Sequence, residues 1–100
     1  MENEIKIYNI VRNNIIEKDP MKIGPSEEKK MAVYSSVISD IVLRINECSS
    51  PAVLQFLLMV IFGYHFPISQ AWPNYSIAIY GPLAASIWDE IKDLLEKNNE

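Results

Sequence analysis

The sequence predicts an all-α fold, a compact four-helix bundle in a single domain spanning residues 1–100. Three observations support this prediction. Apolar residues make up 49% of the 100 residues, they recur at helical spacing in several stretches, and Pro and Gly divide the chain into candidate segments. A chain of this length can build one hydrophobic core but not a second lobe with a cleft between the two.

The first helix is expected from about Asn3 to Glu17, where apolar residues follow a spacing of three or four at Ile5, Tyr8, Val11 and Ile15. Asp19-Pro20 and Gly24-Pro25 end it. The fragment Ile5 to Tyr8 sits in an alternating stretch that also fits a β-strand. If it paired with the segment Ser76 to Tyr80, the fold would be α+β, which is the main alternative to the all-α prediction.

The second helix is expected to start after Ser26, a residue type that caps helix N-termini, with Glu27 and Glu28 in the first turn. It has the most regular apolar pattern in the chain, a seam with spacings of 3, 4, 3, 4 and 3 at Met31, Tyr34, Ile38, Ile41, Ile45 and Cys48. This seam favours a core-facing helix of a bundle. The alternative is a homodimer that forms a coiled coil through the Met31 to Cys48 seam.

The third helix is expected to begin at Ser50-Pro51, a cap followed by proline at the first helical position, and to end near Gly63. Between Val53 and Phe62 only Gln55 is polar, so we expect this helix to be the fully buried central element. The fourth helix is expected to open at Gly81-Pro82 and to present an apolar face at Leu83, Ile87, Ile91 and Leu94.

Residues 48–88 contain no Asp, Glu, Lys or Arg, although these four types make up 22% of the chain. Such a segregation indicates folded core, a partner surface or a membrane hairpin. A membrane-spanning helix needs about 20 predominantly apolar residues, whereas the strongly apolar stretch here ends at Phe62, and no excess of Lys and Arg flanks the run. A membrane hairpin is therefore the less favoured alternative.

A long aromatic connector, residues 63 to 82, is expected between the third and fourth helices. It contains five of the ten aromatic residues, three of the six prolines and the single histidine. A loop of this length is uncommon in a small domain unless it is functional, although Ser69 to Trp72 could form a short helical turn. Aromatic side chains supply large, rigid contact areas, and the residues expected to bind a partner are Tyr64, Trp72, Tyr75 and Tyr80. The other interpretation is that the connector covers the end of the bundle.

The net charge of −4 is concentrated at the C-terminal end, where acidic residues share one face of the last helix at Asp89, Asp93 and Glu96. Such a stripe can steer a basic protein partner, for example a nuclease-like toxin. Nucleic-acid binding is not expected, because there is no clustered patch of Lys and Arg.

No catalytic constellation, metal-ligand cluster or cofactor motif is found. Cys48 and His65 are too few for a closed zinc site, and the three glycines are isolated. We therefore expect no enzyme activity, no metal and no cofactor. A single cysteine cannot form an intramolecular disulfide, and the chain begins without a signal-peptide pattern, so a cytoplasmic location is expected.

These features favour a small acidic cytosolic protein-binding module. The leading hypothesis is a stoichiometric inhibitor, such as a toxin immunity protein or a phage-encoded antagonist. In size, charge and helical content the chain resembles bacterial nuclease-immunity proteins. The alternatives are a homo-oligomeric structural or adaptor subunit and, less favoured, a small membrane hairpin protein.

Overall fold

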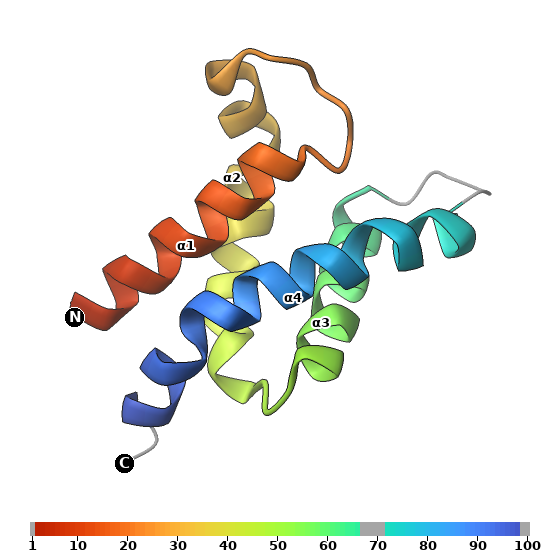
Figure 1. The fold of residues 1–100 in the computed structure, drawn as a ribbon. Helices are drawn as coiled ribbons and strands as arrows, with labels where there is room; N and C mark the ends of the chain where they lie inside the picture. The colour runs from red at the N-terminus through yellow and green to blue at the C-terminus, as the bar shows by residue number, and fades with distance from the viewer. Residues whose placement is uncertain (1, 67–71, 99–100) are drawn as a thin grey trace.

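The computed structural model describes the backbone of residues 2–66 and 72–98, and the side chains of residues 2–66 and 77–95. The helices are α1 (Glu2–Lys18), α2 (Glu27–Arg44), the short 3₁₀ helix η1 (Ile45–Glu47), α3 (Pro51–His65) and α4 (Trp72–Asn98). Each long helix packs on two others, in the cycle α1, α2, α3, α4 and back to α1 (Figure 1). The all-α, four-helix prediction is confirmed.

Two serines start helices where the sequence predicts them. Ser26 Oγ accepts a hydrogen bond from the Lys29 amide at 3.2 Å and caps α2. Ser50 Oγ accepts one from the Val53 amide at 3.2 Å, and Pro51 follows at the first position of α3, where its missing N–H costs nothing. The starts of both helices therefore follow from local chemistry.

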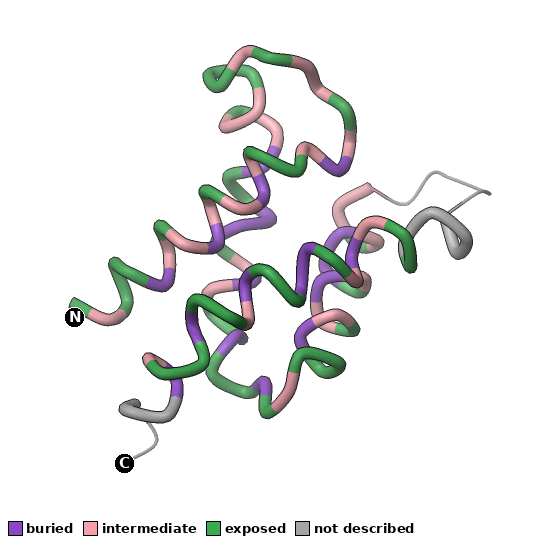
Figure 2. The backbone as a smooth tube through the Cα atoms, viewed as in Figure 1, coloured by how far each residue is buried: buried purple, intermediate pink, exposed green. Residues whose placement is uncertain are grey.

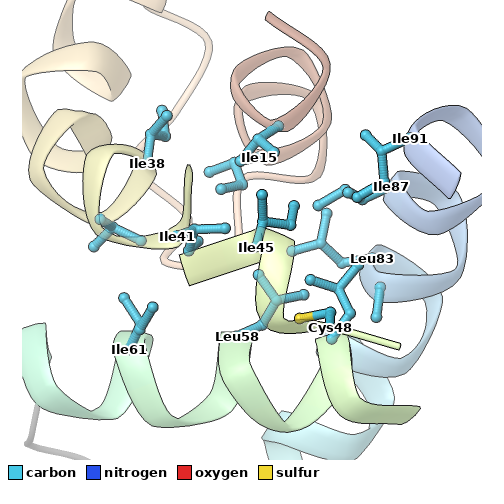
Figure 3. Close-up of a cluster of buried hydrophobic side chains, with 14 of the residues drawn as sticks. Ile15, Ile38, Ile41, Ile45, Cys48, Leu58, Ile61, Leu83, Ile87 and Ile91 are labelled. Carbon is cyan, nitrogen blue, oxygen red and sulfur yellow. The ribbon is translucent and has the colours of Figure 1, made fainter. Parts of the chain in front are cut away.

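All four long helices contribute to one apolar core. The α2 seam lies at its centre: Ile38, Ile41 and Ile45 are at most 1% exposed. Figure 3 shows them beside Ile15 of α1, residues of α3 and residues of α4. From α3 and α4 the core receives Leu58, Ile61, Leu83, Ile87 and Ile91. The seam is thus buried within a single chain. It is not available to a second copy, whereas the coiled-coil homodimer would require an exposed seam.

The connection from α1 to α2 is held by the Asp19 carboxylate. It accepts hydrogen bonds from the Ile23 and Gly24 amides at 2.9 and 3.0 Å and from the Tyr34 hydroxyl at 2.7 Å. The Tyr34 oxygen in turn accepts a bond from the Met21 amide at 2.8 Å. Partial burial opposes ionisation of Asp19, but these hydrogen bonds prevail and lower the pKa of its carboxyl group. We call this set of residues the Asp19 clamp.

The predicted boundary of the last helix is wrong. α4 begins at Trp72, runs through Gly81 and Pro82, and therefore takes up the second half of the predicted aromatic connector. Pro82 lacks the N–H that would bond the Ala78 carbonyl, but both residues are exposed, so water can satisfy that carbonyl. Buried residues on both sides of the proline, Tyr80 and Leu83 among them, outweigh its breaking tendency.

The α+β alternative is also wrong for the described residues, which contain no strand: Ile5–Tyr8 lies in α1 and Ser76–Tyr80 in α4. In α1 the predicted positions Val11 and Ile15 are buried together with Ile7, whereas the predicted Ile5 is exposed. Among the described residues, no helix is both long enough and apolar enough to cross a membrane.

Candidate functional site

The third helix is not fully buried, which corrects the sequence-based expectation. Its inner face, Leu54, Leu58, Ile61 and Phe62, packs into the core. Its outer face is also apolar yet lies in solvent: exposed fractions are 41% for Val53, 68% for Phe56, 51% for Val60 and 81% for Tyr64. We call these four residues the α3 outer stripe. Figure 2 shows buried and exposed positions alternating along α3.

The stripe follows from helix geometry. Its four residues are separated by three, four and four positions, so their side chains lie on one face of α3. A helix that is apolar on every side needs neighbours on most sides to be buried, but α3 packs mainly on α2 and α4. The remaining side has no cover within the described residues.

Beside the stripe lies an open groove of about 620 Å³ between α2 and α3. One wall is charged and is formed by Asp40, Arg44 and Glu47, at the C-terminal end of α2 and in η1. The other wall is apolar and is formed by α3, through Leu57, Val60, Ile61 and Tyr64. Val60 and Tyr64 belong to both the groove and the stripe, so the two form one continuous surface.

A short polar contact between His65 and Asp40 joins the two helices near the end of the groove. His65 Nε2 lies 2.6 Å from Asp40 Oδ2, with side chains 21% and 44% exposed. Asp40 and Arg44 lie four positions apart on α2, but the short contact of the Asp40 carboxylate is with His65. The Tyr64 and His65 rings meet edge to face, with centroids 5.4 Å apart. The His65–Asp40 contact therefore ties the last turn of α3, which carries Tyr64, to α2.

The structure separates the residues predicted to bind a partner. Tyr64 is exposed and lines the groove, as expected of a contact residue. Tyr80 is 1% exposed, and its ring packs against Phe62 with centroids 4.9 Å apart, so its assignment to a surface is wrong. Burial raises the pKa of the Tyr80 hydroxyl. Trp72 and Tyr75 lie in the first turns of α4, but their side chains are outside the described residues.

The acidic residues belong to a different helix from the groove. Asp89 and Asp93 are exposed on α4, on the side away from the buried Ile87 and Ile91, and neither lines the groove. The side chain of Glu96 is outside the described residues. The predicted aromatic and acidic contact residues are thus not gathered into one site.

Sequence reasoning missed Phe56, Val60 and the charged wall of the groove. The signal was present in α3 itself. Val53, Phe56, Val60 and Tyr64 mark one face, while Leu54, Leu58, Ile61 and Phe62 mark another, and a helix with two main neighbours cannot cover both. What the pattern could not tell is which of the two faces the other helices cover.

A second hollow, of about 400 Å³, lies between α1 and α4 and is mostly polar. Here Ser86 Oγ donates to Asn14 Oδ1 at 2.6 Å, and Asn14 Nδ2 donates to Glu90 Oε2 at 2.9 Å and to the Ile10 carbonyl at 2.8 Å. These groups satisfy one another and link α1 to α4, so we interpret the network as structural. In the described part of the chain, no group of three His, Cys, Asp or Glu residues could hold a metal ion.

Comparisons with protein-family models, with curated proteins and with solved structures found no match to this chain.

Proposed function

We propose that this chain is a protein-binding module that works through the outer face of α3. The α3 outer stripe carries the proposal. Two aromatic and two aliphatic side chains lie exposed in a row on one helix, and contiguous exposed apolar surface commonly marks a place where another macromolecule binds. The bundle behind the stripe has its own core, so these side chains are not needed to complete it.

The composition of the surface supports a protein as the ligand. Phe56 and Tyr64 are aromatic, the type most often responsible for binding energy at protein interfaces, and Val53 and Val60 extend the apolar area between them. Asp40, Arg44 and Glu47 form a polar edge along one side. An apolar centre with a polar edge is the usual composition of a protein interface.

The short contact between His65 and Asp40 supports a preorganised surface. It holds the C-terminal turn of α3 against α2, and so limits the freedom that Tyr64 would lose on binding. Side chains fixed in advance cost less conformational entropy when a complex forms. A cytoplasmic, reducing location remains part of the proposal. It is supported by the single cysteine, Cys48, whose thiol is buried and whose pKa is raised by that burial and by Glu47.

The test is affinity capture with the tagged chain, its Phe56→Glu variant and a matched control, Leu43→Glu. Leu43 is apolar and 80% exposed, but it lies outside the stripe and the groove. We expect proteins that the original chain and the Leu43→Glu variant retain and the Phe56→Glu variant loses, identified by mass spectrometry, and an untagged copy of the chain added to the lysate counts among them. Equal capture by all three proteins would contradict the proposal.

A second candidate is the stoichiometric inhibitor of a basic protein, working through α4. The exposure of Asp89 and Asp93 favours it, because exposed charges of one sign raise the association rate with an oppositely charged partner. Asp93→Lys should slow association with a captured basic partner at low salt and much less at high salt. Glu17→Lys, which makes the same change in net charge on α1, is the control. Equal effects of the two substitutions on the association rate would contradict this candidate function.

A further inference from the structure

We propose that the partner of the α3 outer stripe is a second copy of this chain, in a two-fold symmetric dimer built on α3 against α3. This inference rests on the proposed function, because it names the occupant of the same surface. Three features carry it: the absence of charge on α3, the mixed signs of the groove wall, and the area of the stripe.

The first feature is the uncharged α3. Residues 51–65 contain no Asp, Glu, Lys or Arg, and their only ionisable side chains are Tyr64 and His65. When α3 of one copy lies on α3 of the other, no strongly charged group of this helix has to leave water, so the cost of desolvating buried charges does not arise on this helix. The net charge of −4 on each copy resides outside residues 48–88, and therefore outside the contact that α3 makes.

The second feature is the wall of the groove, which carries both signs. Asp40 and Glu47 are acidic and Arg44 is basic. In a two-fold symmetric dimer both copies contribute the same surface patch to the interface, so this patch has to be complementary to itself. A wall with both signs meets this condition, since Arg44 of one copy can face a carboxylate of the other.

The same wall is less suited to other occupants. A strongly basic partner would be better matched by a wall of acidic residues alone, and Arg44 stands between the two acids. An anionic membrane surface would be better matched by Lys and Arg around the stripe, whereas the wall carries two carboxylates.

The third feature is area. Aromatic side chains bury about 150–250 Å² each, so Phe56 and Tyr64, at 68% and 81% exposure, present roughly 300 Å². The two valines add on the order of 100 Å². Two stripes thus bring about 800 Å², and the flanking groove walls raise the sum to about 1,000 Å², the lower limit of a specific interface. Interfaces at this lower limit are typical of weak, transient complexes, so we expect a dimer that dissociates in the micromolar range.

The helical spacing fits this contact. The stripe runs along most of α3, with Phe56 and Val60 near its middle and Val53 and Tyr64 toward its ends. If the two helices run antiparallel, the two-fold axis passes near Phe56 and Val60, and Val53 of each copy lies toward Tyr64 of the other. Phe56 is the aromatic side chain nearest this axis, so we expect it to be the most sensitive position.

Sedimentation velocity of the full chain from about 1 to 300 μM tests the proposal, because this range brackets a micromolar dissociation constant. We expect the weight-average mass to rise from monomer to dimer with concentration. Phe56→Glu should raise the dissociation constant at least ~30-fold, and Val60→Glu should raise it in the same direction. Leu43→Glu adds the same charge at an exposed apolar residue outside the surface and should leave the constant unchanged.

Circular dichroism should show that all three variants keep their helical content, since each replaced side chain is about half exposed or more. A chain that stays monomeric throughout the range, or a dimer that Phe56→Glu and Val60→Glu leave intact, would overturn the second-copy proposal. If the monomer still captures another protein through Phe56, only this inference fails. If the monomer captures no protein through Phe56, or binds phosphatidylcholine–phosphatidylglycerol vesicles instead, the proposed function fails as well.

Discussion

Two tyrosines near the C-terminal turn of α3, one inside the core and one on the surface, show how differently neighbouring regions of this molecule are used. Tyr34 is 0% exposed: its hydroxyl belongs to the Asp19 clamp, and its ring meets Phe62 and Phe66 with centroids 6.2 and 6.5 Å away. Tyr64 is 81% exposed, and the contact described for its ring is with the neighbouring His65. The same residue type therefore closes the core in one region and faces solvent in the other.

The difference extends to the surroundings of each tyrosine. Near Tyr34, buried polar atoms have hydrogen-bond partners. Asp19 and Lys22 have positive φ there, and hydrogen bonds to side chains hold this stretch of backbone in place. Near Tyr64, apolar side chains remain in water. Natural surfaces tolerate scattered apolar residues, but a row of them along one helix is better explained by a binding role than by stability.

The largest expected effect comes from making one substitution in both regions. Tyr34→Ala should lower the free energy of unfolding by about 3–5 kcal/mol, because it leaves a cavity in the core and opens the Asp19 clamp. Tyr64→Ala should lower it by no more than about 0.5 kcal/mol. Urea unfolding followed by circular dichroism measures both values. Similar losses for the two variants would show that Tyr64 covers the core and would remove the contrast.

A smaller effect is expected when the charge of the Asp19 clamp is removed. Asp19→Asn keeps a residue that tolerates the positive φ but weakens the accepted hydrogen bonds, which should cost about 1–3 kcal/mol at neutral pH.

The pH dependence of this effect follows from the lowered pKa of Asp19. The ionised carboxylate stabilises the fold fully above its ordinary pKa of 3.8, and this contribution is lost as the pH falls through the lower value of the folded state. The gap in the free energy of unfolding between the original chain and the Asp19→Asn variant should therefore shrink below about pH 4. Urea unfolding at several pH values measures this gap. A gap that stays constant down to pH 2 would mean that the charge of Asp19 contributes nothing.

A smaller effect than that of Asp19 is expected from the His65–Asp40 contact beside the groove. Asp40→Asn should lower the free energy of unfolding by about 0.5–1 kcal/mol, because the pair with His65 is partly exposed to solvent. A double-mutant cycle with His65→Gln isolates the interaction of the two side chains, and Arg44→Gln on the same wall is the control. A coupling energy near zero would show that the pair does not anchor the last turn of α3.

The predictability of the candidate site differs from residue to residue. Tyr64 could be predicted, since an aromatic side chain just after Gly63 near a helix end is a reasonable contact residue. The burial of Tyr80 could not be predicted, because it requires α4 to begin before Gly81 and Pro82. Asp40 could not be assigned to the groove either, because its contact with His65 joins residues 25 positions apart.

The sequence by itself determined the all-α class, the start of α2 at Ser26, the start of α3 at Ser50-Pro51 and the burial of the α2 seam. Capping bonds are local, and a seam with regular helical spacing can bury only one face. Tertiary structure decided where α4 begins and which face of α3 stays in water. The sequence of a helix that is apolar on every side does not indicate how many neighbours the helix will have. Only the packing of α3 on α2 and α4 therefore determines that the α3 outer stripe stays exposed.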